Sequence, residues 1–145
     1  MRQDRLVNVT TQDRLAIHEL LALHGHLVDA GALDRLDELF TDDVVYDLEP
    51  LGGTALNGVE AIRTAARQLG DRNPVAHLVT NVVVREHDGE VTACSKFLGV
   101  QRDGSVGSGV YEDVLRRTAD GWRISRRRVS ASAAGNARAT GADRG

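Results

Sequence analysis

The first part of the chain carries apolar residues at the spacing of an amphipathic helix. Between residues 10 and 31 they recur three and four positions apart, at Ile17, Leu20, Leu21, Leu27 and Val28. This spacing is typical of a helix that buries one face. Thr10 followed by Asp13 resembles an N-terminal cap, and Gly31 resembles a stop signal. The pattern therefore predicts a first helix between these two signals.

Residues 32–50 predict a short helix followed by a strand. The apolar residues of 32–40 recur at helical spacing, and the polar residues 41–43 end this helix. Residues 44–50 are typical of a strand, which Pro50 closes because proline has no amide hydrogen to donate.

A further helix is predicted over residues 59–69. Asn57 followed by Glu60 resembles the capping box with which many helices begin. The glycine and proline between Gly70 and Pro74 then end the helix. The first half of the chain is therefore expected to be mostly helical.

The second half changes from helical spacing to the alternation of strands. Asp-Gly pairs at 88–89, 103–104 and 120–121 separate β-rich runs, and this dipeptide is the strongest short-range signal for a hairpin turn. The runs predict a meander of four antiparallel strands, over residues 75–87, 90–102, 105–117 and 121–131. Strands of this length usually form a strongly curved sheet.

Helices followed by an antiparallel meander predict an α+β fold. The simplest packing wraps the curved sheet around the N-terminal helices and leaves an internal pocket between them. We expect one such domain over residues 1–131. Residues 132–145 have no apolar periodicity and predict a disordered tail.

Composition narrows the class of protein. A chain of 145 residues that is 41% hydrophobic and 27% charged is typical of a single soluble domain. Its apolar runs are too short for a membrane helix and its start lacks the apolar core of a signal peptide, so we expect a cytoplasmic protein that does not bind membranes. A net charge of -3 with 3% aromatic residues gives neither the basic stripe nor the stacking platform of a nucleic-acid binder.

The motifs that hold metals, phosphates or activated serines are missing. The sequence contains no glycine-rich phosphate loop, no GxSxG, no HExxH and no CxxC. The single Cys94 cannot form an intramolecular disulfide or a Cys-rich zinc site. His24 and His26 are two positions apart, which puts them on different sides of a helix. We therefore expect no cofactor and no metal, which leaves acid/base chemistry or simple ligand binding.

Three polar residues stand out for possible chemistry. His24 falls on the apolar face of the first helix, where a buried imidazole needs a partner. Asp29 lies near the end of that helix, and on spacing alone it is more simply a solvated carboxylate on the helix flank. His77 begins a strand whose two faces are both largely apolar, so it faces a closed space either as a catalytic group or as a hydrogen-bonded core residue. An Asp and a His that meet in such a space form an acid/base unit.

Two further candidates lie in strands. Strict alternation in the last strand puts Trp122, Ile124, Arg126 and Arg128 on one face and Arg123, Ser125, Arg127 and Val129 on the other. An arginine on the inner face is a candidate to bind an anion or an oxyanion, although such a run is more often a solvated edge. Tyr46 is either an ordinary core residue or a hydroxyl that lines the pocket.

In their order along the chain, these segments resemble the SnoaL-like group of the nuclear transport factor 2 like superfamily. The likeness covers about residues 8–130 and rests on LxxLxxxF, TDD, VVYDL, GVEAI, HLVTN, GSGVYEDVLRR and DGWRISRR. The resemblance implies a cone of curved sheet closed by helices around a deep pocket. In lyases of that group an Asp ends the first helix and a His opens the HxxTN strand, and these match Asp29 and His77. The group commonly has Tyr or Lys where this chain has His24, and Tyr46 and Arg126 match its aromatic and its final-strand arginine.

This resemblance implies a cofactor-independent lyase or isomerase, of the dehydratase or cyclase type, that acts on a mostly apolar ring-containing metabolite, as in polyketide or other secondary metabolism. His77 would remove a C–H proton with Asp29 orienting it, while His24, Tyr46 or Arg126 polarises a carbonyl or protonates the leaving oxygen. If His24 is that acid, it must be protonated while His77 is neutral. The alternatives are epoxide opening and a binding protein whose Asp and His are idle.

Binding partners are expected on both sides of the sheet. We expect the substrate to contact Tyr46, Val75, Leu98 and Trp122. The outer face of the sheet carries apolar residues that favour self-association into a homodimer or a larger homo-oligomer, namely Leu78, Val82, Val84, Val110 and Val114.

Overall fold

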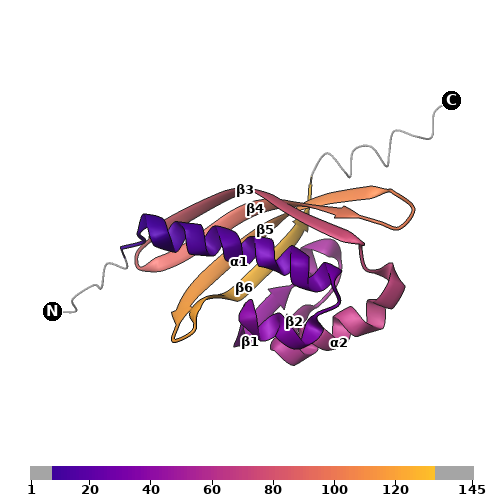
Figure 1. The fold of residues 1–145 in the computed structure, drawn as a ribbon, viewed down its shortest axis with the longest axis horizontal. Coiled ribbons are helices and arrows are strands. Elements are labelled where there is room, and N and C mark those ends of the chain that lie inside the picture. The colour runs from indigo at the N-terminus through magenta and orange to yellow at the C-terminus, as the bar shows by residue number, and fades with distance from the viewer. Residues whose placement is uncertain (1–7, 133–145) are drawn as a thin grey trace.

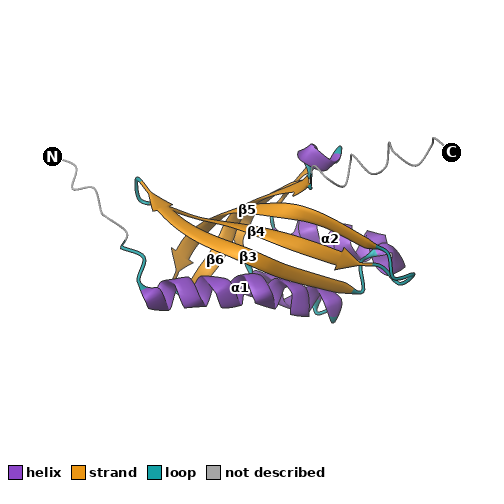
Figure 2. Ribbon diagram, turned by 90° about the horizontal axis from the view of Figure 1, so that it is seen from above, coloured by secondary structure: helices purple, strands orange, loops and turns teal. Residues whose placement is uncertain are grey.

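A curved sheet with a long helix across one face forms most of the structure. The computed structural model describes residues 8–132. Figure 1 shows α1 lying across the strands, with α2 beside β1 and β2 at one end, and Figure 2 shows the sheet arching over α1. The elements are α1 (Thr11–Asp29), η1 (Leu33–Glu38), β1 (Phe40–Asp47), η2 (Glu49–Leu51), β2 (Ala55–Asn57), α2 (Val59–Leu69), η3 (Gly70–Arg72), β3 (Ala76–His87), β4 (Glu90–Val100), β5 (Val106–Thr118) and β6 (Gly121–Ala131), where η marks a 3-10 helix.

The sheet has six strands in the order β2-β1-β6-β5-β4-β3. Strands β3 to β6 form the predicted antiparallel meander, with bounds within two residues of those expected from the Asp-Gly pairs. β1 pairs with β6 in parallel, and β2 pairs with β1 antiparallel. The α+β prediction is confirmed. The sheet is an open one that ends at β2 and β3, so it curves without closing into a barrel.

α1 begins and ends where its capping signals predict. The Thr10 side chain accepts a hydrogen bond from the amide of Asp13, and the Asp13 carboxylate accepts one from the amide of Thr10 at 3.0 Å. Gly31, just after the helix, has a φ of 68°, which glycine adopts without strain. The apolar face of the helix packs on the sheet, and the core includes Ile17, Leu21, Leu36, Phe40 and Ile124.

The segment between α1 and α2 differs from its prediction. The second helix is only the 3-10 helix η1, and residues 41–43 belong to β1 instead of ending a helix. The short strand β2 was not predicted at all. Asn57 pairs with Val45 in that strand, so the helix cap falls on Gly58, which makes no side-chain hydrogen bond. The predicted Asn57 capping box is therefore wrong, because Asn57 belongs to β2 and pairs with β1 instead of capping the helix.

A bulge in β3 changes which side chains face the core. Thr80 pairs with Lys96 and Val83 with Cys94, so β3 has one residue more than β4 in this stretch. Asn81 has a φ of 55°, a left-handed conformation that Asn tolerates better than most residues. Beyond the bulge Val84 is 6% exposed and Val83 47%. The expected outward positions of Val82 and Val84 are therefore wrong, since both pack toward the core.

A second bulge has the same effect in β6. Leu115 pairs with Ile124 and Val114 with Arg126, which leaves Ser125 as the extra residue. Trp122 and Ile124 are buried before the bulge, and Arg127 and Val129 are buried after it. Arg126 therefore faces outward, against the prediction from strict alternation.

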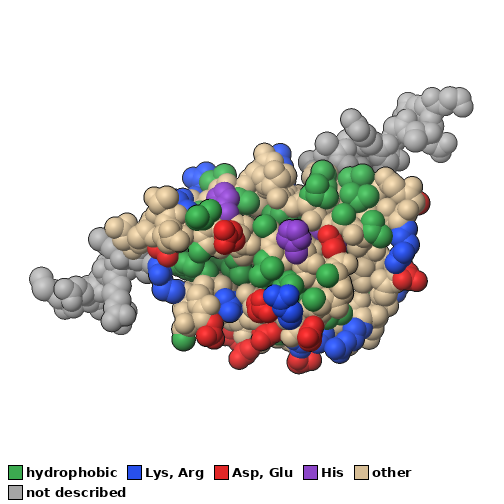
Figure 3. Space-filling model, in the orientation of Figure 1, with side chains coloured by type: hydrophobic (Ala, Val, Ile, Leu, Met, Phe, Trp, Pro, Cys, Tyr) green, Lys and Arg blue, Asp and Glu red, His purple; other side chains and the backbone are tan. Residues whose placement is uncertain are grey.

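The outer face of the sheet remains apolar in places. Leu78 and Leu98 are register partners on β3 and β4, and both are exposed, as are Val83 and Val106. On the opposite side of the molecule, Figure 3 shows charged side chains gathered over η1 and α2. Within residues 8–132, none of the helices is both long and apolar enough to cross a membrane.

Candidate active site

The structure brings Asp29 and His77 into direct contact. Asp29 is the last residue of α1, and His77 is the second residue of β3. Oδ2 of Asp29 accepts a hydrogen bond from the His77 amide at 3.0 Å, and Oδ1 lies 2.6 Å from His77 Nδ1. The Asp29 and His77 side chains are 26% and 12% exposed. Asp29 is therefore partly exposed to solvent, as its position on the helix flank predicts, and it also binds His77.

The contact determines which nitrogen of His77 can act as a base. An ionised carboxylate only accepts hydrogen bonds, so the proton in the 2.6 Å contact is on Nδ1. The neutral ring then has its lone pair on Nε2. The carboxylate also stabilises the imidazolium that forms when Nε2 takes a proton. This arrangement suits a general base.

His24 lies beside this pair, inside a group of rings. Its ring is centred 5.9 Å from that of His77, 5.8 Å from that of Tyr111 and 6.2 Å from that of Phe40, each edge to face. Burial, then the charge of Arg127, holds the pKa of His24 well below its ordinary value. His24 is therefore a neutral ring near pH 7. Of the two alternatives for His24, these surroundings disfavour the protonated acid and favour the packed core residue.

Arg127 and Asp113 form a buried ion pair next to these rings. Neither side chain is exposed, and Arg127 donates from Nε and Nη2 to the two Asp113 oxygens at 2.7 and 2.8 Å. Burial by itself lowers the pKa of Arg127, but the charge and hydrogen bonds of Asp113 more than offset this and raise it above its ordinary value. The guanidinium lies over the Tyr111 ring, with 3.9 Å from Cζ to the centroid.

Two phenols complete the group. Tyr111 stacks on Phe97 with ring centroids 4.3 Å apart, and the ring of Tyr46 is centred 5.9 Å from that of Phe40. Burial raises the pKa of both tyrosines, so both phenols keep their protons and remain hydrogen-bond donors. We call the five polar residues the inner polar cluster: His24, Tyr46, Tyr111, Asp113 and Arg127. Its net charge is zero, because Arg127 is matched by Asp113.

Three residues of this cluster were not predicted as site residues from the sequence: Asp113, Tyr111 and Arg127. Strict alternation put Arg127 on the wrong face because the Ser125 bulge has no signal in the composition of β6. Asp113 did carry a signal, since it stands between Tyr111 and Leu115 on the inward side of β5, where a carboxylate needs a buried partner.

Three other predicted site residues have exposed side chains: Arg126, Leu98 and Val75. The Arg126 side chain is 54% exposed on the outer face, with Nη2 3.8 Å from a carboxylate oxygen of Asp47. Leu98 is exposed on the outer face and Val75 is exposed just before β3.

Trp122 is buried, but at the far end of α1. Its Nε1 donates to Asp13 at 3.1 Å. A helix of 19 residues is roughly 28 Å long, so Asp13 and Asp29 lie far apart. The expectation that Trp122 lines a site together with His77 is therefore wrong.

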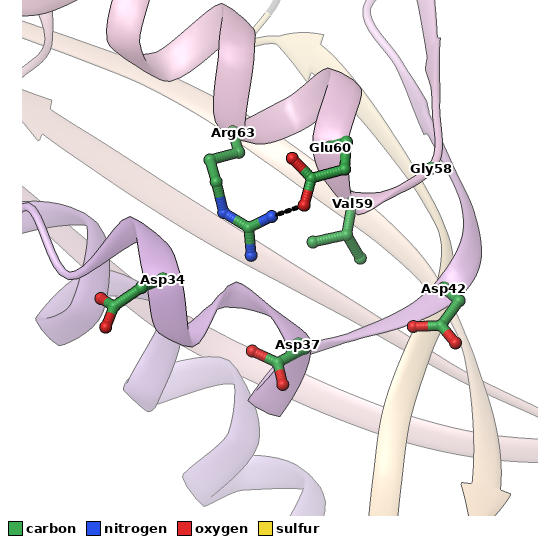
Figure 4. A pocket seen from close by; sticks show the side chains of 7 residues that line it. All are labelled: Asp34, Asp37, Asp42, Gly58, Val59, Glu60 and Arg63. Carbon is green, nitrogen blue, oxygen red and sulfur yellow. Dashed lines mark hydrogen bonds and ion pairs between the residues drawn. The ribbon is translucent and has the colours of Figure 1, made fainter.

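An acidic groove lies outside this site. It has a volume of about 550 Å³ between η1 and α2, and Figure 4 shows Asp34, Asp37 and Asp42 around it, with Arg63 paired to Glu60. In the part of the chain that the structure describes, no three His, Cys, Asp or Glu side chains are placed to hold a metal ion together. The groove shares no residue with the pair or with the inner polar cluster.

Comparison with known proteins places the chain in a large group. The family model of the SnoaL-like domain matches residues 9–128. The uncharacterized protein Rv2910c of Mycobacterium tuberculosis is 34% identical over 79% of this chain and 82% of its own length. The small subunit of anthranilate 1,2-dioxygenase from Burkholderia cepacia is 30% identical over 72% of this chain and 77% of its own. A crystal structure of a provisionally assigned aromatic ring hydroxylase from Novosphingobium aromaticivorans is 32% identical and covers 84% of this chain and 90% of that one, with a TM-score of 0.69.

Proposed function

The chain belongs to the SnoaL-like domain family of the nuclear transport factor 2 like superfamily, and from this premise we propose that it is a cofactor-independent lyase or isomerase of the dehydratase or cyclase type. The observation that carries the proposal is the double contact of Asp29 with His77, at 3.0 Å to the amide and 2.6 Å to Nδ1. The first contact holds the carboxylate in place and the second leaves Nε2 as the base.

The proposed reaction begins when Nε2 of His77 removes a proton from a carbon next to a carbonyl. The C–H electron pair enters the carbonyl as an enolate, and Asp29 stabilises the imidazolium. The enolate then re-forms its carbonyl and expels the hydroxyl from the neighbouring carbon, while the imidazolium returns its proton to that oxygen. Water leaves and His77 is neutral again. The phenols of Tyr46 and Tyr111 supply hydrogen-bond donors for the substrate oxygen.

The charge of the surroundings supports a neutral substrate. His24 is neutral, both phenols are protonated, and the charge of Arg127 is already matched by Asp113. An anionic substrate would therefore meet no unmatched cation in this group, and burying its charge would be costly. We propose a mostly apolar ring compound with a carbonyl and a hydroxyl group.

Elimination of water from cyclic β-hydroxy ketones tests this proposal. The wild-type chain should convert some members of such a panel to enones, which ultraviolet absorbance detects. Asp29→Asn and His77→Ala should each lower the rate about 10²–10⁴-fold, and the double variant should lose little more, because the two residues act as one unit.

A matched control pair exists on the surface. His87 and Asp88 also form a His–Asp contact, at 3.2 Å, with both side chains about nine-tenths exposed. His87→Ala and Asp88→Asn should keep the full rate. Full activity in Asp29→Asn or His77→Ala would refute the proposed mechanism.

A second candidate is a small subunit of an aromatic-ring-hydroxylating enzyme, in which the pair is idle. It is favoured by the 30% and 32% identities to the dioxygenase small subunit and to the ring hydroxylase. The two candidates differ in what the chain does alone. Turnover by the purified chain supports the lyase, whereas a chain that is inactive alone and raises the turnover of a catalytic dioxygenase subunit supports the accessory role.

We also propose that the chain self-associates through the outer face of its sheet. The adjacent exposed pair Leu78 and Leu98 supports this, because exposed apolar neighbours favour burial against a partner. Light scattering should give a multiple of the chain mass, and Leu78→Glu combined with Leu98→Glu should return it to one chain. Leu15→Glu, at an exposed leucine of α1, is the control. A wild-type protein with the mass of one chain would contradict self-association.

A further inference from the structure

A glycine lies inside α1, where it is unfavourable. Gly25 is buried and belongs to the regular part of the helix, four residues before its end. Glycine is the poorest residue for a helix interior apart from proline, because it loses the most backbone freedom on folding. Its position therefore needs a structural reason.

The reason is a close approach of α1 to β3. A Cβ atom at position 25 would lie 2.6 Å from the carbonyl oxygen of His77, and 3.6 Å from the carbonyl carbon. Ordinary contact begins near 3.4 Å, so any other residue must push the helix and the strand apart. The oxygen cannot swing aside, because it belongs to the backbone of a strand that pairs with β4 opposite Gly99.

The same approach sets the distance between Asp29 and His77. Asp29 follows Gly25 by four residues, so both lie on the side of the helix that faces β3. A helix displaced at Gly25 also carries the Asp29 carboxylate away from His77. We infer that Gly25 is the positioning residue of the pair: it lets α1 approach β3 closely enough for Asp29 to hold the His77 ring. Its importance for catalysis rests on the function proposed above.

The test reads the tautomer of His77 and needs no substrate. In the ¹⁵N-labelled protein, the bond to Asp29 should hold the proton on Nδ1, with a downfield resonance for that proton. Gly25→Ala should lose this resonance and shift the ring toward the Nε2–H tautomer, which a histidine without a partner prefers. Asp29→Ala gives the reference spectrum for the lost contact.

Two further variants separate positioning from stability. Ala22→Gly weakens α1 at an exposed position and should leave the His77 spectrum unchanged. Gly25→Ala combined with Asp29→Glu should recover the Nδ1 resonance, because the extra methylene restores the reach of the carboxylate. Circular dichroism checks the fold of each variant, and sucrose is added where a variant is partly unfolded, since excluded osmolytes favour the compact state.

The possible outcomes are distinct. If Gly25→Ala keeps the wild-type tautomer, or stays unfolded in sucrose, then Gly25 does not position the pair and the inference is overturned. If the tautomer changes and the glutamate restores it, the inference stands. If the tautomer changes while the dehydration rate does not, the inference stands and the proposed function fails.

Discussion

The two ends of α1 use the same residue type for different purposes. Near the start, Asp13 binds the indole nitrogen of Trp122 at 3.1 Å, and at the end Asp29 binds Nδ1 of His77 at 2.6 Å. Each aspartate thus joins the helix to a ring that comes from a distant strand. The ends differ in what else reaches the carboxylate and in whether the ring can change its charge.

Asp13 is saturated by fixed donors. It accepts from the amide and the hydroxyl of Thr10 at 3.0 and 2.9 Å, and Arg117 lies 3.0 Å away. The backbone hydrogen bond from Thr10, then those from Trp122 and Arg117, hold the pKa of Asp13 far below its ordinary value. Its indole partner does not ionise. Asp13 therefore has a structural role, because it holds the start of α1 against β6.

Asp29 receives hydrogen bonds only from His77 among the described residues, and no Arg or Lys there lies within ion-pair distance. Its partner can take up a proton on Nε2, so the carboxylate can stabilise a charge that appears and disappears. The difference indicates that saturation by permanent donors marks an aspartate that builds the fold. One titratable partner with a free nitrogen marks a candidate for chemistry.

The largest difference should appear between variants that remove the carboxylate charge at one end of α1 or at the other. Asp29→Asn should lower the dehydration rate about 10²–10⁴-fold, because the imidazolium loses its carboxylate partner. The melting temperature should change little, because the amide oxygen of Asn can still accept one of the two hydrogen bonds from His77. Asp13→Asn should keep the rate and lower the melting temperature by several degrees, because the cap and the Trp122 contact are weakened. Initial rates and thermal melts check both, and a slow but thermally normal Asp13→Asn would break the comparison.

The next largest effect should come from breaking the Arg127–Asp113 ion pair, which lies beside the end of α1 that carries Asp29. Arg127→Met leaves Asp113 buried without its partner and should destabilise the protein by about 3–5 kcal/mol, measured by urea unfolding. Arg127→Met combined with Asp113→Leu should recover most of the loss, since no unpaired charge remains. Arg126→Met, one residue away on the outer face, should change stability by at most about 0.5 kcal/mol. An equally mild Arg127→Met would show that this cluster is not buried as described.

The smallest expected effect is on the stability of the protein at low pH, through Asp13. Because the folded pKa of Asp13 is lowered from its ordinary 3.8, its contribution is fully present above that value and is lost as the pH falls below it. Unfolding at a series of pH values between 2 and 6 should show this loss in the wild type. Asp13→Asn should have a shallower dependence. An unchanged slope in that variant would assign the acid sensitivity to other carboxylates.

Much of the fold is predictable because its signals are local. Thr10 and Asp13 cap α1 through contacts within a single turn, and the Asp-Gly pairs place the hairpins of the meander, so both follow from the order of residues. The Asp29–His77 contact was expected only through the family resemblance, and spacing alone favoured a solvated carboxylate.

The features of the fold and of the site that the sequence did not predict depend on contacts between distant segments. The Ser125 bulge shifts the register of β6 against β5, and for this reason Arg127 faces inward and Arg126 faces outward. β1 finds its parallel place beside β6, and β2 pairs with β1, only when the sheet is assembled. The neutral state of His24 follows from the rings and the arginine that surround it.

The amino-acid sequence by itself therefore determined the two α-helices, the four-strand meander, their order and the family, and the family resemblance named Asp29 and His77 as candidates. Tertiary structure decided which side chains face inward, which carboxylate is saturated and how closely Gly25 lets the helix approach His77. The physical reason is range: caps and turns are closed by residues a few positions apart. Bulges, buried charges and helix-to-strand distances are set by segments that meet only in the folded chain.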